Sequence, residues 1–509
     1  MNTKPEIQKL INYIEENTRA SQVSGISFID PKNHKGKILL KQNHVVFGRR
    51  GAGKTSLINT LCDVHKINNH IITYTNLEDY KDVSFPNILL HVLQAFFKQI
   101  KRHLKTRLRQ NPISYPKYLR ILRKINRNLK EIENSIITPD KLEEKIKEKG
   151  SADAKVDFKF GASSSTAKVG IGDSSSVEIE KTLIRDKLDT LKNSIPNLKE
   201  ILTLIASFID KKPIFIILDD FYFVPKNVQP YFIDFFHRLS KDTMLYLKLA
   251  TIKHRSKLYL QLSDSYIGTE LGHDIHEIDL DYTLDKFEEL KNFMHSLVQE
   301  ACKEINIQVD LDPIFSEAGL SQLCLASGGV PRDYLILLKK LLEKYQLDVK
   351  KISKQDVIET AIENMVNKIS SLKTDSATEK DILEYYLHAI QDYIIKDKST
   401  NIFLVNNRDL DSFPQIRQAI NELLDLRMFH LVESNISAAP SDGKMYMAFM
   451  IDIGLYTNAK PRDFNQVEPD VTDTKGRKDQ IRSSPRLTNA VLEKIYAGDN
   501  YIDALTLTD

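Results

Sequence analysis

The pattern of apolar positions changes its period along the chain. Short unbroken apolar runs alternate with stretches in which apolar residues recur every three to four positions. The first pattern is typical of strands buried on both faces of a sheet, and the second predicts amphipathic helices. The expected strands are 44–47, 71–75, 214–218 and 245–252, and the expected helices between them are 55–64 and 86–105. This alternation predicts an α/β core.

The connection over 102–212 is too long for a simple link between two core elements. Residues 98–130 contain 12 Lys or Arg and no Asp or Glu. This segment is a candidate contact for duplex DNA or for an acidic protein surface, with Tyr115 and Tyr118 either stacking on bases or packing locally. A solvated helical face explains the same pattern without a ligand.

The middle of this insertion, 151–180, is rich in Gly and Ser. It holds two segments of alternating apolar and polar residues, 156–160 and 177–180. We interpret these two segments as the strands of a mobile hairpin that projects from the core.

The pattern becomes helical from residue 284 to residue 371 and then changes again. The next elements expected are helix 379–396, strand 402–405, helix 413–426, and strands 429–433 and 445–453. A turn that contains Pro440 and Gly443 links the last two strands and resembles a wing. This order predicts a winged-helix domain. The tail after Lys460 is mixed in charge and poor in aromatic residues, so we expect it to be loosely ordered.

The N-terminal segment 1–21 predicts an amphipathic helix that buries Ile7, Leu10, Ile11 and Ile14. It lacks the apolar core of a signal peptide, and no run of about 18 apolar residues occurs in the chain, so we expect no membrane span. The three cysteines, Cys62, Cys302 and Cys324, are widely separated and form no CxxC pair. Neither a zinc site nor a disulfide framework is indicated, and a reducing, cytoplasmic location is expected. The net charge of +3 is too small to indicate nucleic-acid binding by itself.

One motif carries specific chemistry. It reads Gly48-Arg49-Arg50-Gly51-Ala52-Gly53-Lys54-Thr55, followed by Ser56, and matches G-x-x-x-x-G-K-[ST] between an expected strand and an expected helix. The glycines let backbone N–H groups turn inward around phosphate oxygens. Lys54 supplies a charge to the β- and γ-phosphates, Thr55 offers a hydroxyl to Mg²⁺, and the helix N-terminus faces the phosphates. The alternative is a chance glycine-rich turn.

An acidic element follows in the order that such a site requires. The apolar run 214–218 ends in Asp219 and Asp220. We expect Asp219 to hold Mg²⁺ through water and Asp220 to orient or polarise the attacking water. The alternative is a strand end with two solvated acids.

Two later positions are candidates for sensing the γ-phosphate. Thr251 stands at the tip of the strand 245–252, with Arg255 a candidate charge sensor just beyond it. Arg332 follows a Gly-Gly-Val-Pro turn and opens a helix, from which it can reach phosphate across a domain cleft. An ordinary strand exit and an arginine paired with a nearby acid are the alternatives.

These four elements in this order, with a helical lid and a winged helix after them, resemble AAA+ ATPases of the origin-recognition-complex-like clade and the related STAND signalling ATPases. The closer resemblance is carried by Leu218-Asp219-Asp220-Phe221-Tyr222-Phe223, Gln229-Pro230, Thr251-Ile252-Lys253-His254-Arg255-Ser256 and Gly329-Val330-Pro331-Arg332-Asp333. These residues are similar to prokaryotic origin-recognition-type AAA ATPases of unassigned role, some of which are suspected to act in defence against mobile elements.

The resemblance covers about residues 35–457 and implies ATP and Mg²⁺ as cofactors. It implies that Lys54 and Thr55 are the Walker-A residues, and that Asp219 and Asp220 are the Walker-B pair. It also implies that Thr251 is sensor 1 and Arg332 is sensor 2. Two features differ from replication initiators: Asp220 stands where Glu is usual, and the turn before Arg332 combines a STAND-like Gly-x-Pro with an initiator-like arginine.

The expected division is therefore an N-terminal helix and lead-in (1–34), an AAA+ P-loop core (35–283), a helical lid (284–371), a winged-helix domain (372–460) and a tail (461–509). Two functions remain open. One is an ATPase that acts on or assembles with duplex DNA, and the other is a STAND-like nucleotide switch that recruits an effector protein, with a homo-oligomer as an expected assembly.

The winged-helix region is the first candidate for the DNA contact. Its helix 413–426 begins with Ser412 as a cap followed by an early proline, and it is expected to bury Ile416, Ile420, Leu423 and Leu424. The face expected to be exposed carries Gln415, Arg417, Gln418, Asn421, Glu422 and Asp425. Gln, Asn and Arg can read base edges, whereas the two acids oppose phosphate attraction. A docking or autoinhibitory domain is the alternative.

Overall fold

The computed structural model describes the backbone of residues 4–18, 26–67, 70–110, 115–137, 156–160, 163–167, 173–263, 265–348, 350–375, 380–456, 461–469, 471–474 and 476–506. Side chains are described within these ranges except for a few stretches, the longest of which is 156–186.

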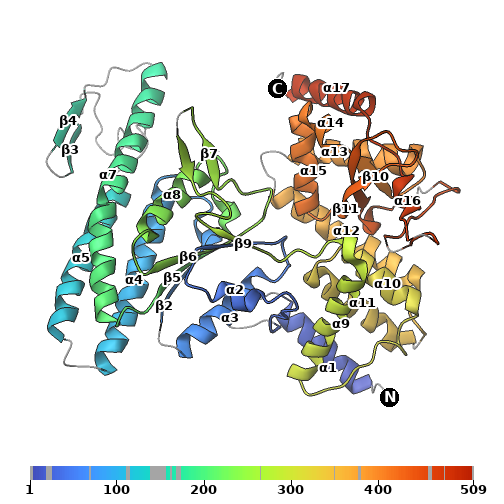
Figure 1. The fold of residues 1–509 in the computed structure, drawn as a ribbon, viewed down its shortest axis with the longest axis horizontal. Coiled ribbons are helices and arrows are strands. Elements are labelled where there is room, and N and C mark those ends of the chain that lie inside the picture. The colour runs from blue at the N-terminus through green and yellow to red at the C-terminus, as the bar shows by residue number, and fades with distance from the viewer. Residues whose placement is uncertain are drawn as a thin grey trace.

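A five-stranded parallel sheet forms the centre of the N-terminal half (Figure 1). Its strands are β1 (His44–Phe47), β2 (Ile71–Asn76), β5 (Ile214–Asp219), β6 (Leu245–Thr251) and β9 (His276–Asp279). Their order across the sheet is β2-β5-β6-β1-β9, and every pair is parallel. The predicted strands are confirmed, and β9 is an edge strand that the sequence pattern did not reveal.

Both faces of the sheet are covered, which explains why its strands are unbroken apolar runs. On one face, α2 (His34–Ile38) and α3 (Lys54–Ile67) pack against Val46, Ile217 and Ala250. On the other face lie α4 (Asn87–Gln110) and α8 (Gln229–Ser240), which pack against the alternate strand positions, such as Val45 and Phe47. One hydrophobic core therefore lies on each face of the sheet.

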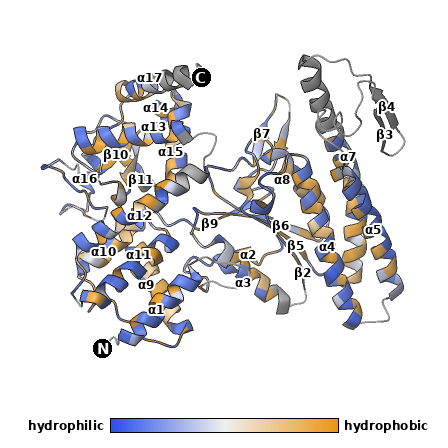
Figure 2. Ribbon diagram, turned by 180° about the vertical axis from the view of Figure 1, so that it is seen from behind, coloured by the Kyte–Doolittle hydropathy of each residue, from blue (hydrophilic) through white to orange (hydrophobic). Residues whose placement is uncertain are grey.

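The long insertion extends this second core outward. Helices α4, α5 (Tyr115–Ile137) and α7 (Asp173–Phe208) pack together beside β2, on the side of the sheet away from the C-terminal half (Figure 1). Hydrophilic and hydrophobic positions alternate along α4 and α5, as expected for helices with one face in a core (Figure 2).

A hairpin does occur in the insertion, but its second strand was predicted wrongly. β3 (Val156–Phe160) pairs antiparallel with β4 (Ser163–Ala167). The segment 177–180 instead belongs to α7. Its two apolar residues fit a helix as well as a strand, because a four-residue alternation is too short to separate the two periods.

The chain after β9 forms a helical layer, as predicted. It comprises α9 (Phe287–Glu304), α10 (Glu317–Ala326), α11 (Pro331–Asp348) and α12 (Lys354–Asp375). The N-terminal helix α1 (Lys4–Asn17) packs against α11 and α9, so it joins this layer rather than the sheet (Figure 1). Its four predicted core residues, Ile7, Leu10, Ile11 and Ile14, are all buried.

The C-terminal half has the element order of a winged helix. This order is α13 (Lys380–Gln391), β10 (Ile402–Val405), α14 (Asn407–Asp411), α15 (Pro414–Asp425), β11 (Phe429–Ser437) and β12 (Met445–Ile451), with the sheet arranged β10-β12-β11. The short helix α14 was not anticipated. Ser412 ends α14 instead of capping α15, whose N-cap is Phe413, while the early proline is in place.

The prediction of a loosely ordered tail is wrong for the described residues after 460. Isolated bridges join Thr400 to Asn465 and Leu404 to Arg486. Helix α17 (Asn489–Thr506) packs against α13, and Leu492 is fully buried. The tail has too few apolar residues to fold alone, but those few contact a core that the domain before it supplies.

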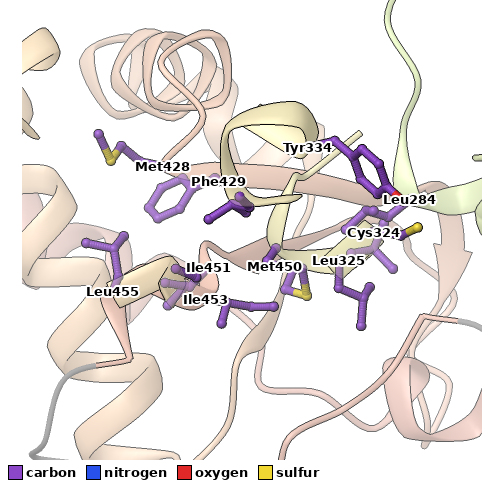
Figure 3. Close-up of a cluster of buried hydrophobic side chains, with 14 of the residues drawn as sticks. Leu284, Cys324, Leu325, Tyr334, Met428, Phe429, Met450, Ile451, Ile453 and Leu455 are labelled. Carbon is purple, nitrogen blue, oxygen red and sulfur yellow. The ribbon is translucent and has the colours of Figure 1, made fainter. Parts of the chain in front are cut away.

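A single continuous core joins the helical layer to the C-terminal half. Figure 3 shows Leu325 and Tyr334 of the helical layer beside Phe429 and Met450 of the winged helix. Helix α12 also continues across the domain boundary expected near residue 371. The domain boundaries themselves stay a prediction.

Candidate functional site

A cavity of about 460 Å³ opens at the carboxyl edge of the parallel sheet, between the turn after β1 and the helical layer. Its walls come from the segment after α1, the glycine-rich turn, the ends of β2 and β5, and the helices α9 and α11. The lining residues are Asn17, Thr18, Ile26, Ser27, Phe28, Ile29, Arg50, Gly51, Ala52, Gly53, Lys54, Thr55, Ser56, Tyr74, Asn76, Glu78, Asp219, Asp220, Tyr222, Phe293, Leu297, Pro331, Arg332 and Leu335. The predicted phosphate motif and acidic strand end thus share one cavity.

The glycine-rich turn leaves β1 and leads directly into α3. Gly51 and Gly53 have φ of 91° and 98°, in the left-handed region that side chains disfavour. The turn is tied to the sheet by Gly48, whose N–H donates to the carbonyl of Thr251 over 3.2 Å. Residues 50–56 line the cavity, and α3 begins at Lys54, so the positive end of a helix faces it.

Lys54 lies within its own loop. Its Nζ donates to the carbonyl oxygens of Gly48 at 2.8 Å and Arg49 at 3.3 Å. Burial lowers the pKa of this ammonium group, and the carboxylates of Asp220 and Asp219 oppose that effect. A buried cation next to two carboxylates is well placed to exchange its carbonyl partners for phosphate oxygens.

Asp219, at the end of β5, accepts two hydrogen bonds on the same oxygen. Oδ2 receives the hydroxyl of Thr55 at 3.1 Å and the phenol of Tyr74 at 3.0 Å. The side chain is almost fully buried. The hydroxyl and carboxylate predicted to hold a metal ion are therefore adjacent.

Asp220 follows in the left-handed conformation, with φ of 52°. This conformation turns its side chain away from the strand direction, and the residue lines the cavity. Burial, and then the neighbouring charge of Asp219, raise the pKa of this carboxyl to about 6.

Thr251 and Arg255 are not brought to the cavity. The hydroxyl of Thr251 forms a hydrogen bond with the hydroxyl of Ser256, and Thr251 is fully buried at the carboxyl end of β6. The guanidinium of Arg255 lies over the ring of Tyr222, 5.3 Å from its centroid. A residue's place at the tip of a strand does not determine which way its side chain points, and here local partners hold both.

Arg332 is brought to the cavity, and its backbone N–H donates to the carbonyl of Gly51 over 3.3 Å. A Cβ atom added to Gly51 would lie 2.6 Å from the Cβ of Arg332. The helical layer therefore rests directly on the phosphate-type turn, and this close approach requires glycine at position 51.

Arg49 was predicted to bind phosphate, but the structure turns it away from the cavity. Its N–H and Nε donate to Asp281 Oδ1 at 2.9 and 3.3 Å, and its Nη2 donates to the carbonyl of Tyr282 at 2.8 Å. The residue is buried behind the turn, where it anchors the turn to the segment that enters α9. Motif matching could not distinguish this arginine from Arg50, which lines the cavity.

Sequence reasoning missed several lining residues. Tyr74 and Asn76 lie at the end of β2, and Asn76 pairs in register with Asp219. This position, at the end of the strand beside the acidic strand, is the signal that could have identified them. The apolar wall formed by Phe28, Phe293 and Leu335 joins three distant segments and left no local signal.

No group of three or more His, Cys, Asp or Glu suited to a metal ion occurs among the described residues. A Mg²⁺ ion needs less from the protein, because it commonly keeps several waters and takes one or two protein oxygens plus substrate phosphates. The Thr55 hydroxyl and the Asp219 carboxylate fit that requirement.

The predicted DNA-reading helix, α15, is partly covered. Ile416, Ile420 and Leu423 are buried as expected, whereas Leu424 is half-buried. Glu422 and Asp425 were expected on the exposed face and are buried instead. The reason is that α15 ends against the N-terminal α/β core, where Asp425 Oδ2 accepts the N–H of His254 at 3.2 Å.

Tyr118, predicted as a candidate for base stacking, is also buried and lies against Phe208. Tyr115 is 53% exposed. Among the described residues, no helix is both long enough and apolar enough to cross a membrane.

No family profile matches the chain, and no curated protein matches it by sequence. Two solved structures are similar at 11% identity. The Aeropyrum pernix Orc1 protein in complex with DNA has a TM-score of 0.32, over 89% of this chain and 90% of that chain. Cdc6p from Pyrobaculum aerophilum has a TM-score of 0.31, over 92% and 96%.

These superpositions are loose, so the fold is assigned from the strand order, the turn after β1 and the element order of the C-terminal half. On these features, the chain has an α/β core with a parallel sheet and a P-loop-type turn, followed by a helical layer and a C-terminal half with the element order of a winged helix.

Proposed function

We propose that this chain binds and hydrolyses ATP with Mg²⁺ and that the nucleotide controls a contact with duplex DNA. The observation that carries the ATPase is the pairing of Asp219 with Thr55 at 3.1 Å, directly beside the buried amine of Lys54. A hydroxyl, a carboxylate and a lysine around a glycine-rich turn are the groups that phosphoryl transfer requires.

Each wall of the cavity suits one part of the nucleotide. The apolar wall, with Phe28, Phe293 and Leu335, suits a flat purine ring. The turn over residues 50–56 suits the phosphates, which its backbone N–H groups would bind. A bound Mg²⁺ supplies positive charge to the phosphate oxygens, and Thr55 and Asp219 would hold it.

Asp220, directly after β5, and Arg332 of α11 both line the cavity. Asp220 would accept a proton from the attacking water or orient that water, as a carboxylate at this position can. Arg332 would bind phosphate from the lid and hold the lid closed while the triphosphate is present. The hydroxyl of Thr251 bonds Ser256 and the guanidinium of Arg255 lies over the ring of Tyr222, so both would act only after a local rearrangement.

The DNA contact is proposed from two features. The C-terminal half has the element order of a winged helix, and the insertion carries a dense run of cations. A homo-oligomer and a separate effector protein stay predictions of the sequence.

The test is the ATPase rate of purified wild type and Lys54→Ala, with and without duplex DNA, over a salt series. We expect Mg²⁺-dependent turnover in wild type, stimulation by DNA that decreases steeply with salt, and no turnover in Lys54→Ala. Full turnover in Lys54→Ala would refute the site. A slow rate indifferent to DNA would instead favour a nucleotide switch.

A second variant tests the role of Asp220 separately. Asp220→Asn keeps the size of the side chain and removes its ability to accept a proton, so ATP should bind with little loss while turnover falls. Equal losses of binding and turnover would show that Asp220 supports binding instead.

A further inference from the structure

The insertion helices α4 and α5 present a dense set of cations to solvent. We name the exposed ones the basic face. Its members are Arg102, Lys105 and Arg109 of α4, and Lys117, Arg120, Arg123, Arg127 and Lys130 of α5. None of these eight forms an ion pair with another described residue, and no carboxylate occurs within 98–130.

Glu131, which directly follows Lys130, is exposed beside the basic face, whereas three other carboxylates of this bundle have other partners. Glu133 lies 3.9 Å from Lys98, and Asp210 lies 3.0 Å from Arg107. Glu200 pairs with Lys124. The three cations that face neighbouring helices are thus neutralised, whereas those of the basic face keep their charge.

The two helices present their cations on one side of the pair. Along α5, positions 117, 120, 123, 127 and 130 recur every three to four residues, on the side opposite the buried Ile121 and Ile125. Lys101 donates to Asn126 over 2.9 Å across the exposed seam between α4 and α5. Arg102 and Lys105 of α4, and Arg127 and Lys130 of α5, lie within four residues of this contact, so this part of the basic face spans both helices.

The cations of α15 and of the wing are arranged differently. The one cation of α15, Arg417, forms an ion pair with Asp411, and it also donates to the carbonyl of Asn407. The one cation in the wing (residues 438–444), Lys444, lies 3.1 Å from Asp409. Each of these cations would have to leave a carboxylate before it could neutralise a phosphate.

From this contrast we infer that duplex DNA binds chiefly to the basic face of α4 and α5, through its phosphate backbone, and not to the winged helix. The inference rests on the proposed DNA contact and specifies its location. It places that contact beside the outer strand β2, on the side of the sheet away from the winged helix (Figure 1).

The dimensions of the basic face suit duplex DNA. Lys117 and Lys130 are 13 residues apart on a helix that rises about 1.5 Å per residue, which gives a length of about 20 Å. A duplex carries about one charge per 1.7 Å of axis, so about twelve phosphates lie along that length. Single-stranded nucleic acid is less suitable, because stacking of successive bases requires several exposed aromatic rings, and of the two tyrosines of α5 only Tyr115 is exposed.

The test is the salt dependence of binding to a 30-base-pair fluorescent duplex of random sequence. The variant carries Lys117→Gln, Arg123→Gln, Arg127→Gln and Lys130→Gln, all at exposed positions remote from the cavity. Each neutralised phosphate contributes about −0.9 to the slope of log K against log salt, so the loss of four contacts should make the slope shallower by about 3.6. Affinity at 0.1 M salt should fall at least about tenfold, while the ATPase rate without DNA should stay unchanged.

Two controls make the result specific. A charge-matched variant with Lys286→Gln, Lys303→Gln, Lys351→Gln and Lys396→Gln should keep the wild-type slope. A winged-helix variant with Arg417→Gln and Lys444→Gln should lose less than the variant of the basic face. An unchanged slope in the variant of the basic face, or a larger loss of affinity in the winged-helix variant, would overturn the inference. Either result would leave the ATPase proposal intact.

Two further outcomes separate this inference from the proposed function. Salt-dependent binding through the basic face in a protein without ATP turnover would support the inference and refute the ATPase. Turnover in a wild type that shows no affinity for duplex would overturn the inference and leave an acidic protein as the partner to seek.

Discussion

Asp333, the residue after Arg332 at the start of α11, forms a buried ion pair with Arg427 in the turn between α15 and β11. Lys368 of α12 lies 3.3 Å from the same carboxylate and 2.7 Å from Asp452, which also accepts His430 at 2.9 Å. A charged network therefore connects the start of α11, directly after the cavity residue Arg332, with the sheet of the winged helix. The two parts should move together.

Arg427→Met should destabilise the protein by about 3–5 kcal/mol, because it leaves the carboxylate of Asp333 buried with less compensation. The double variant Asp333→Asn with Arg427→Met should recover part of that loss. Denaturant unfolding of the two single variants and the double variant measures the coupling. Additive losses would show that the pair does not act as a unit.

Asp452 should stabilise the folded protein at neutral pH, and this stabilisation should be lost in acid. The Lys368 and His430 partners hold the pKa of this carboxyl well below its usual range, despite its burial. Its contribution is therefore complete above the unfolded pKa of about 4 and is lost as the pH falls through the folded pKa. Asp452→Asn should lower Tm at pH 7, and the difference from wild type should shrink as the pH falls below about 4.

A matched control for that experiment is Asp392→Asn. Asp392 pairs with Lys396 at 2.8 Å on the surface, with both side chains more than half exposed. Exposed pairs contribute at most about 1 kcal/mol, so Tm should hardly change at any pH. Equal effects of the two variants would mean that the buried network contributes no more than a surface pair.

Gly51→Ala should separate α11, at the start of which Arg332 lies, from the phosphate-type turn. The new Cβ would meet that of Arg332 at 2.6 Å, so α11 would have to withdraw. The affinity for ATP should fall, and hydrogen exchange at the start of α11 should rise. Gly443→Ala is the control, because its φ is also positive, at 77°, but nothing lies within 4 Å of its Cβ. If both variants bind ATP equally, the lid contact does not matter for binding.

Tyr74→Phe removes one of the three hydrogen bonds that the carboxylate of Asp219 accepts. A hydrogen bond to a charged group contributes about 1.5–3 kcal/mol, so the Mg²⁺ concentration for half-maximal ATPase should rise about tenfold or more. The affinity for nucleotide without Mg²⁺ should stay close to that of wild type. An unchanged Mg²⁺ requirement would show that Thr55 and the N–H of Asp220 suffice to position the carboxylate.

Local patterns in the sequence determined the strands, the phosphate-type turn and the acidic strand end. Each depends on neighbours within a few residues: an apolar run for β5, glycines at 51 and 53 for the turn, and helical spacing for α1. The sheet then places Lys54, Thr55, Asp219 and Asp220 together, because the carboxyl ends of all its parallel strands lie on one edge, although β6 separates β1 from β5.

Only the tertiary structure decided which way side chains point and what covers them. Arg49 and Arg50 are neighbours in one motif, yet Asp281 holds the first away from the cavity that the second lines. The helical spacing of residues 413–426 predicts that Asp425 is exposed, but the loop at His254 buries it. These partners lie far away in sequence, and no local pattern encodes a contact between segments that only the folded chain brings together.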